Sequence, residues 1–292
     1  MLAITITATP NLSSSQHQQA DELIQQVQAH DHTHRDPYLS NQFNVFPDMP
    51  AFFLASQQQE LVGLLTLYAD EGPSGSVDVT LNVLPKYRRQ GVARQLWQSA
   101  KQTLRQYGYQ QVEFMTEQIF LEQAPALLQN MQLTQDPVHE FQMIAPLHHV
   151  AKQESHLQVH PLRETDIETL LPVYCEAFDA SFDEARRYLT VSYTARDKIS
   201  YVSEIDGKLI GYCAIDVGSY NYLFGVCIAA AYRHQGLGSR FLDQVMGQVA
   251  DKPLKLGVES DNLIARRLYQ KLGFTDETQV WYVQTMQVFW TV

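Results

Sequence analysis

The sequence is poor in the residues on which several classes of protein depend. Its 292 residues include only 3 cysteines, Cys175, Cys213 and Cys227, which lack the spacing of a metal site and cannot all be paired in disulfides. Basic side chains are fewer than acidic ones, 21 against 32, and the formal net charge of −11 argues against nucleic-acid binding. No stretch approaches the roughly 20 apolar residues that a membrane span requires. We therefore expect a cytoplasmic protein with reduced thiols, no membrane attachment and no nucleic-acid partner.

What the sequence does contain is an internal repeat. The turn Arg88-Arg89-Gln90-Gly91-Val92-Ala93 returns as Arg233-His234-Gln235-Gly236-Leu237-Gly238, and the two copies are 145 residues apart, almost half of the chain. Each copy follows an apolar, strand-like run that ends in a Tyr-Arg pair, and each precedes apolar residues at helical spacing. We predict two tandem α/β domains, at 1–150 and 151–292, each a mixed, bent β-sheet flanked by helices.

The start of each half and the junction between them can also be placed. The stretch 13–28 carries apolar residues at helical spacing and predicts a first amphipathic helix. The equivalent helix of the second half is expected to begin near Thr165, a candidate N-cap. A polar stretch between Ala145 and Gln158 precedes a fresh strand-like run, and we expect the domains to meet there.

The second glycine turn has the properties of a phosphate-binding loop. A turn at the start of a helix exposes backbone N–H groups where the helix dipole is positive, and glycine lets the backbone approach a phosphate closely. Other nucleotide motifs fit poorly. No Gly-Lys-Ser/Thr follows, and Phe241 stands where a dinucleotide fingerprint has its third glycine. The turn therefore favours a pyrophosphate held mainly by backbone amides.

A second motif follows further along the chain, Asn262-x-x-Ala265-x-x-Leu268-Tyr269-x-x-x-Gly273-Phe274. Together with the preceding Arg233-x-x-Gly236-x-Gly238, in this order and spacing, it resembles the GNAT superfamily of acyl-CoA N-acyltransferases. The resemblance covers the second half from about Leu157. The first half matches only the glycine turn, with Ala93 in its last position. The duplicated layout is similar to that of tandem GNAT proteins.

This resemblance implies roles for residues of the second half, with acetyl-CoA as co-substrate and no metal. The pyrophosphate would be held by the backbone amides of Arg233, His234, Gln235, Gly236, Leu237 and Gly238. The strand Val226-Cys227-Ile228 would bind the pantetheine arm and polarise the thioester carbonyl. Asn262 would steady the arm, and Tyr269 would protonate the departing thiolate, since a tyrosine hydroxyl is a donor across neutral pH. The alternative for Tyr269 is plain packing beside its leucine neighbours.

Both halves depart from the family pattern. In the first half Leu128 aligns with Tyr269 and Leu121 with Asn262, and leucine cannot donate a proton, so we expect a catalytically silent first domain. In the second half the strand before the turn carries a glutamate in many members of the superfamily, but 221–225 contains no carboxylate. Asp216 and Glu259 are candidate bases, and each also fits a solvated surface carboxylate. A base is dispensable if the acceptor arrives neutral.

On these grounds the sequence favours an N-acyltransferase that moves an acetyl group from coenzyme A directly to a primary amine, in a small molecule or a peptide. The acidic balance suits a cationic acceptor and equally an ordinary cytoplasmic protein. One alternative is a non-catalytic module that binds acyl-CoA or a partner protein, and another, transfer from an aminoacyl-tRNA, is disfavoured by the negative charge. The tract His30-Asp31-His32-Thr33-His34 resembles a metal-binding run but is interpreted as a loop. The residues specify neither the acceptor nor the oligomeric state.

Overall fold

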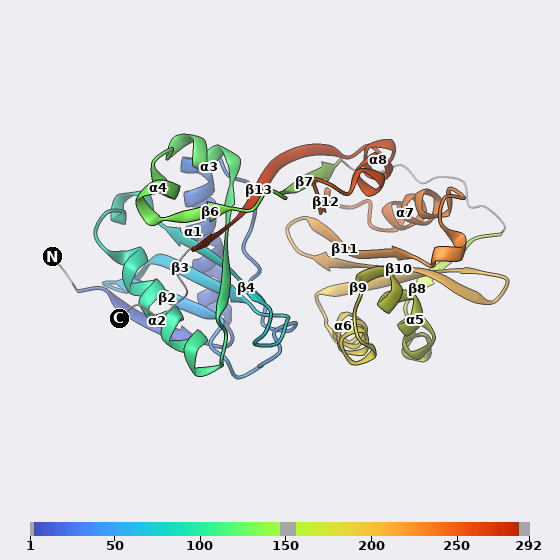
Figure 1. Cartoon of the computed structure of the whole chain (residues 1–292), viewed down its shortest axis with the longest axis horizontal. Helices are drawn as coiled ribbons and strands as arrows, with labels where there is room; N and C mark the ends of the chain where they lie inside the picture. Colours follow the sequence, from blue (N-terminus) through green and yellow to red (C-terminus); the bar gives the residue numbers. More distant parts are fainter. Residues whose placement is uncertain (1–2, 147–155, 286–292) are drawn as a thin grey trace. The chain divides into compact units, whose positions relative to one another are not determined.

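The chain folds into two compact units that are not consecutive halves of the sequence. A computed structural model describes residues 3–146 and 156–285. The first unit comprises Met1–His139 with Thr278–Val292, and the second comprises Glu140–Glu277. These units differ from the predicted domains 1–150 and 151–292 by two strands that are labelled in Figure 1, β7 (Glu140–Ala145) and β13 (Thr275–Thr285). The expected junction between Ala145 and Gln158 falls mostly outside the described residues.

The first unit is built on a mixed sheet with the strand order β1-β2-β3-β4-β5-β13, and β6 pairs with β13. Its strands are β1 (Thr5–Thr9), β2 (Phe52–Gln57), β3 (Glu60–Tyr68), β4 (Ser76–Val83), β5 (Gln111–Glu117), β6 (Leu133–Gln135) and β13 (Thr275–Thr285). Its helices are α1 (Ser14–Asp31), the 3-10 turn Pro85–Tyr87, α2 (Val92–Gln106), α3 (Gln118–Gln123) and α4 (Leu127–Met131). Only β4 and β5 run parallel among these pairs.

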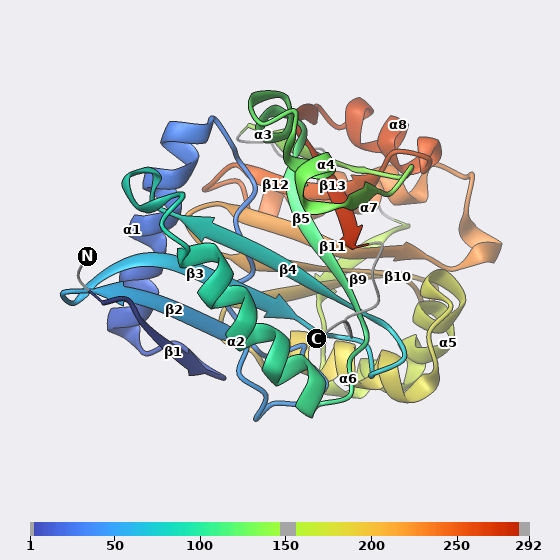
Figure 2. The ribbon, with the colours of Figure 1, turned by 60° about the vertical axis from the view of Figure 1, so that its left-hand side comes forward.

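Helices α1 and α2 cover opposite faces of this sheet, as the alternation of a strand requires. Ser13 caps α1 in a capping box with Gln16, which confirms the predicted first helix. The apolar face of α1 packs on Leu54 and Leu64, whereas α2 packs on the neighbouring residues Phe53 and Leu65. Figure 2 shows α2 crossing in front of the sheet.

The second unit is built on a mixed sheet with the strand order β7-β12-β11-β10-β9-β8. Its strands are β7 (Glu140–Ala145), β8 (Gln158–Pro161), β9 (Lys198–Ile205), β10 (Lys208–Val217), β11 (Asn221–Ile228) and β12 (Leu254–Glu259). Its helices are the 3-10 turn Glu164–Asp166, α5 (Ile167–Phe178), α6 (Phe182–Thr194), the 3-10 turn Ala230–Tyr232, α7 (Leu237–Gln248) and α8 (Leu263–Lys271). Only β11 and β12 run parallel among the pairs described.

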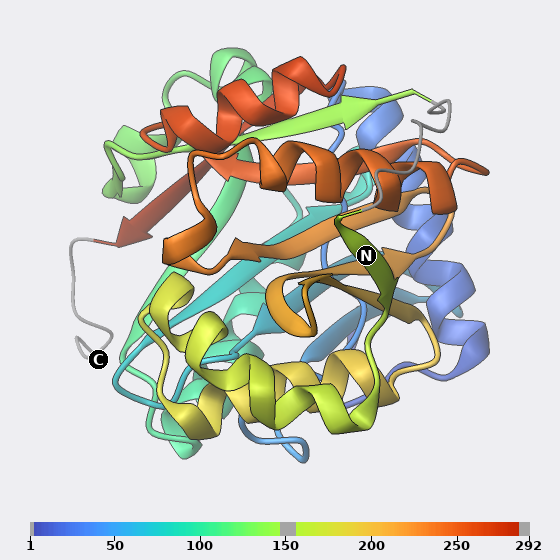
Figure 3. The ribbon, with the colours of Figure 1, turned by 90° about the vertical axis from the view of Figure 1, so that its right-hand side faces the viewer.

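Figure 3 shows this sheet between α5 and α6 on one face and α7 and α8 on the other. Side chains alternate accordingly along β10, where Tyr212 and Ala214 pack with α5 and α6, and Cys213 and Ile215 pack with α7. The expected N-cap at Thr165 is wrong. That residue lies within a 3-10 turn, and α5 begins at Ile167 with Asp166 as its cap residue. The prediction of two α/β units, each with a mixed sheet flanked by helices, is confirmed.

The two units exchange strands, which is not expected if each repeat of the sequence formed a domain by itself. Strand β7 follows the first repeat in sequence but pairs antiparallel with β12, from Ala145 opposite Leu254 to Glu140 opposite Glu259. Strand β13 ends the second repeat, but its residues from Val280 onward pair with β5 of the first unit. Each unit therefore takes an edge strand from the other half of the sequence.

No helix among the described residues combines the length and apolarity that crossing a lipid bilayer requires.

Candidate active site

The glycine turn of the second unit joins the end of β11 to the start of α7. Gly236 is the N-cap of α7 and has a φ of +77°, a backbone conformation that favours glycine. No side chain caps this helix and no acidic residue lies in its first turn. The first N–H groups of a helix have no partner within the helix, and the dipole makes this end positive. The turn can therefore accept an anion on its backbone amides.

Two side chains of the turn bond to the chain that precedes it. Arg233 Nε donates to the carbonyl oxygen of Ile228 over 2.8 Å, and Gln235 Nε2 donates to that of Ala231 over 3.0 Å. These bonds fold the turn back against the strand end. A Cβ placed on Gly236 would meet nothing within 4 Å, so the turn has an open side.

The strands next to the turn separate, and β11 also contains a bulge. Strands β11 and β12 pair only from Asn221 to Leu223, with Leu256 as the last partner. Beyond that point, the rest of β11 and the last residues of β12 border a gap in the ladder. In the same part of β11 the register with β10 shifts between Tyr212 and Ala214, and Gly225 has a φ of +62°. Such a bulge disrupts the local ladder and re-aims the backbone, here beside the gap.

Val226, Cys227 and Ile228 follow this bulge, as the last residues of β11. The Cys227 side chain lies in the core with α5 and α6, and burial raises the pKa of its thiol to about 12. Cys227 therefore presents only its backbone groups at the edge of β11, and its thiol stays protonated in the core. Cys213 is buried as well, whereas Cys175 is only partly buried, so the interpretation of the cysteines as buried thiols holds for two of the three.

Helix α8 brings Tyr269 to the same region. Asn262 caps the helix, its side-chain oxygen accepting the Ala265 amide over 3.1 Å. Leu268 and Ile228 both lie within 4 Å of the position that a Cβ on Gly238 would take, at 3.9 and 3.6 Å. The start of α7, the end of β11 and α8 therefore converge.

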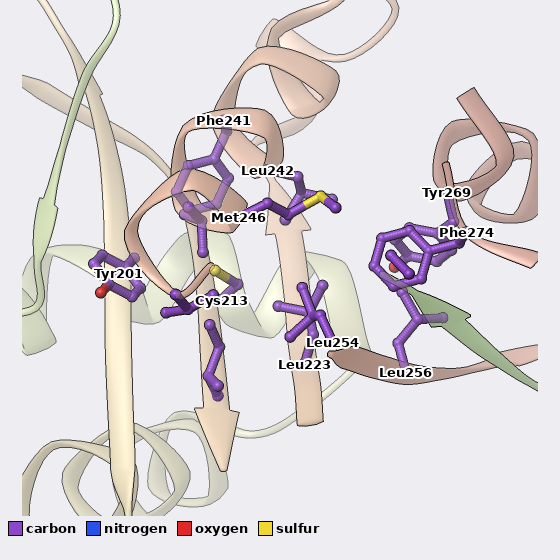
Figure 4. Packing of buried hydrophobic residues seen from close by; sticks show 14 of the residues in the cluster. Tyr201, Cys213, Leu223, Phe241, Leu242, Met246, Leu254, Leu256, Tyr269 and Phe274 are labelled. Carbon is purple, nitrogen blue, oxygen red and sulfur yellow. The ribbon is translucent and has the colours of Figure 1, made fainter. Parts of the chain in front are cut away.

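Tyr269 itself is buried, with 7% of its surface exposed. Figure 4 shows it beside Phe274, and the two rings meet edge to face with centroids 5.8 Å apart. Burial is the main cause that raises the pKa of the Tyr269 hydroxyl, and the nearby Cys213 and Tyr222 raise it further. The hydroxyl therefore holds its proton throughout the physiological range.

The two carboxylates suggested by the sequence occupy different settings. Asp216 lies on β10 opposite Tyr222 and forms an ion pair with Lys198, whose side chain is fully buried. Burial raises the pKa of Asp216, and the attraction of Lys198 opposes this. Glu259 is exposed at the end of β12. A third carboxylate, Glu140, stands opposite Glu259. Sequence reasoning missed it because β7 belongs to the first repeat and only the fold places it here.

The glycine turn of the first unit has nearly the same conformation. Gly91 has a φ of +84°, Arg88 Nε donates to the Val83 carbonyl oxygen over 2.9 Å, and Gln90 Nε2 donates to that of Lys86 over 2.8 Å. Arg88 also pairs with Asp31 through two hydrogen bonds of 2.8 and 2.6 Å.

The surroundings of this turn differ from those in the second unit. Strands β3 and β4 keep an unbroken register, so β4 has no counterpart of the Gly225 bulge. Two short helices, α3 and α4, stand in place of α8, and Leu128 lies on α4.

The histidine tract lies at the end of α1 and the start of the following loop. Asp31 is engaged by Arg88, and the His34 backbone amide donates to the buried carboxylate of Glu117 over 2.7 Å. Within residues 3–146 and 156–285, no three His, Cys, Asp or Glu side chains are grouped closely enough to hold a metal ion.

Comparisons with known proteins agree with the internal repeat. The model of the Acetyltransferase (GNAT) family matches the chain twice, over residues 17–128 and 167–274. The fold is similar to that of a GCN5-related N-acetyltransferase from Sphaerobacter thermophilus, with a TM-score of 0.71, 16% identity and 100% of both chains covered. It is also similar to a tandem GNAT protein from the clavulanic acid biosynthesis pathway, with a TM-score of 0.70, 15% identity and coverage of 99% and 100%. No curated protein sequence matches the chain.

Proposed function

The chain belongs to the GNAT acetyltransferase family, and on that premise we propose that its second unit transfers an acetyl group from coenzyme A directly to a primary amine. One observation carries the choice of unit. In the second unit an uncapped glycine turn, a bulged strand that leaves its neighbour and a buried tyrosine converge. The first unit has the turn and also separating strands, since β4 and β5 pair only from Ser76 to Val79, but it has neither the bulge nor the tyrosine.

The residues present suit the cofactor that the family uses. Backbone amides from His234 through Gly238 would bind the pyrophosphate, and the open side of Gly236 leaves room for it. The expected contribution of the Arg233 amide is absent, because this amide donates to the Ala230 carbonyl oxygen over 3.2 Å. The backbone of Val226, Cys227 and Ile228 would bind the pantetheine arm at the gap between β11 and β12. Asn262 would help to orient the arm, because its cap bond uses only the oxygen of its amide group.

The same residues supply what acyl transfer needs. Bound acetyl-CoA would provide an activated thioester. Backbone N–H groups at the bulge beside Gly225 would stabilise negative charge on the thioester oxygen. Tyr269 would give its proton to the departing sulfur, and its raised pKa keeps that proton available at neutral pH. Holding both reactants side by side supplies the remaining advantage over reaction in water.

A calorimetric titration combined with a thiol-release assay tests this proposal. Acetyl-CoA is titrated into the full chain, and free thiol is then followed with a panel of aliphatic amines, amino acids and lysine peptides. We expect one binding site per chain and thiol release with at least one amine. Binding without thiol release from any acceptor would favour a non-catalytic acyl-CoA-binding module. Two sites per chain would contradict the assignment of the cofactor to the second unit alone.

A further inference from the structure

The second unit lacks a carboxylate in the first part of β11, yet the exchanged strand β7 brings one to this region. Gln142 of β7 stands opposite Gly257 of β12, and Glu140 stands opposite Glu259. The Glu140 carboxyl group lies over Gly257, in the space that a Cβ on this residue would fill. Glycine at position 257 therefore leaves room for the Glu140 carboxylate, because any other residue would place a Cβ in the same space.

The face on which this carboxylate lies follows from the alternation of the two strands. Leu256 and Val258 of β12, and Phe141 and Met143 of β7, point into the core that α7 covers. Residues between them, Glu140 and Gly257 included, therefore face the other way. The proposed pyrophosphate site is at the start of α7, which covers the core face of the sheet. An acceptor amine that approaches from the opposite face would therefore not be blocked by the cofactor.

The position of the carboxylate along the strand is equally specific. Leu256 is the last residue of β12 that pairs with β11, and Gly257 is the first beyond it. Glu140 therefore stands at the point where the two strands begin to separate. Gly225 lies two residues beyond Leu223, the last residue of β11 that pairs with β12, so the bulge is on the other side of this gap.

We propose that Glu140, contributed by the first half of the sequence, is the general base for the acceptor amine. This role rests on the acetyl transfer proposed above. Glu140 takes one proton from the acceptor ammonium, directly or through a water molecule. The neutral nitrogen then attacks the thioester carbon, a C–N bond forms, and the C–S bond breaks with its electron pair on sulfur. Tyr269 protonates that sulfur and regains a proton from the new amide nitrogen, and Glu140 later releases its proton to water.

Other charged groups on this face are less suited to the role. Lys255 and Glu277 form an ion pair of 2.9 Å, and Gln142 donates to Glu277 over 2.7 Å. Asp216 is engaged by Lys198, and it lies opposite Tyr222, before the strands separate. Glu259 is exposed at the end of its strand. The Glu140 carboxylate alone among these lies over the first residue of the gap.

Substitution of Glu140 in the full chain tests the proposal, with acetyl-CoA and the amine panel as substrates. We expect Glu140→Gln to lower kcat by about 10²- to 10³-fold and to leave the Kd for acetyl-CoA within about twofold. Formate should partly restore the activity of Glu140→Ala, which a purely structural role does not explain. Weakly basic arylamines, already neutral at pH 7, should lose less activity than aliphatic amines. Glu259→Gln should keep kcat within about twofold.

The outcomes separate this proposal from the one on which it rests. Full turnover in Glu140→Gln, with Tyr269→Phe impaired, overturns the role of Glu140 and leaves the acetyl transfer standing. A wild-type chain that releases no thiol overturns both. If Glu140→Gln does not fold, Glu140→Asp decides, because it keeps the charge and withdraws the carboxylate by one methylene. Unchanged kcat in that variant overturns the proposal.

Discussion

The two glycine turns of this protein have almost the same backbone, but the strand that precedes each turn and the helix that follows further along the chain differ. The φ angles of Gly91 and Gly236 are +84° and +77°, and each turn is tied to its strand by the same arginine and glutamine bonds. A local motif of six residues can thus keep its conformation in two units whose surrounding strands and helices differ. The turn identifies where phosphate can bind, but it does not identify an active site.

The differences lie outside the six residues of the turn itself. The second unit has the bulge at Gly225, whereas β4 of the first unit is regular. The second has Tyr269 on a continuous helix, whereas the first has Leu128 on a short one. The exchanged strands differ as well. Glu140 faces the last residue of β12, whereas Val280 faces the corresponding last residue of β5.

The largest expected effect comes from a side chain in the second turn. Gly236→Val should abolish acetyl-CoA binding and thiol release, because the side chain would project into the open space where the pyrophosphate is proposed to bind. Gly91→Val is the matched control. Both changes place valine at a positive φ and should cost roughly 2 kcal/mol of stability. Calorimetry and thermal unfolding measure the two effects. Equal loss of acetyl-CoA binding in both variants would contradict the proposed difference between the two units.

Removal of the tyrosine hydroxyl should have the next largest effect. Tyr269→Phe should lower kcat by about 10²-fold with little change in the Kd for acetyl-CoA, because only proton transfer to the sulfur is lost. Tyr201→Phe is the control, since Tyr201 is buried in the same core cluster. Steady-state thiol release and calorimetry provide the measurements. An unchanged rate in Tyr269→Phe would rule out its acid role.

The arginines of the two turns differ in their acidic partners, and this difference should appear in stability. Asp31 is buried and paired with Arg88, so Asp31→Asn should lower the free energy of unfolding by about 2–3 kcal/mol at pH 7. In the second unit Glu176 lies 4.0 Å from Arg233 and is half exposed, so Glu176→Gln should cost less than about 1 kcal/mol. Urea-induced unfolding of both variants measures the contrast. Equal losses would show that the buried pair contributes no more than the exposed one.

The contribution of Asp31 should also depend on pH. Burial by itself raises the pKa of Asp31, but the bonds and charges of Arg88 and His30 outweigh it, so the pKa lies below the ordinary 3.8. A carboxylate with a lowered folded pKa stabilises the protein above its unfolded value and loses this contribution as pH falls through the folded one. The stability difference between wild type and Asp31→Asn should therefore persist at neutral pH and shrink below pH 3.8.

The smallest expected effect is that of a substitution in the first unit, which should produce no acetyl-transfer activity there. Leu128→Tyr restores a tyrosine to the first unit, but α4 is short and β4 has no bulge, so no new activity should arise. The Gly236→Val background removes the contribution of the second unit and makes the thiol-release assay specific for the first. Thiol release in this double variant would show that a single tyrosine separates a silent unit from an active one.

Much of the local structure could be predicted from the sequence because it depends on short-range rules. Ser13 and Gln16 form the capping box of α1, and both glycine turns begin helices where the apolar spacing indicates. The N-cap at Thr165 was wrong because residues 164–166 form a 3-10 turn before α5, and such turns are frequent at the ends of α-helices. The convergence of the tyrosine helix on the turn was expected only because the two motifs resemble those of the GNAT superfamily.

The exchange of strands could not be predicted in the same way. The residues from Glu140 to Met143 alternate between polar and apolar side chains, and this pattern fits the edge of either sheet. No local feature of the sequence determines which of the two sheets β7 joins. Glu140 was therefore invisible as a candidate for the second unit, and the search for a base stopped at Asp216 and Glu259.

The sequence by itself determined the duplication, the two mixed sheets with their helices, the glycine turns and the position of Tyr269, the residue that we propose as the acid. These depend on periodicity, capping and residue chemistry within a few turns of the chain. Only the tertiary structure decided where β11 bulges and leaves β12, and which unit receives β7 and its Glu140. Strand pairing is a long-range choice among compatible edges, and its outcome is set by the packing of whole sheets rather than by any short segment.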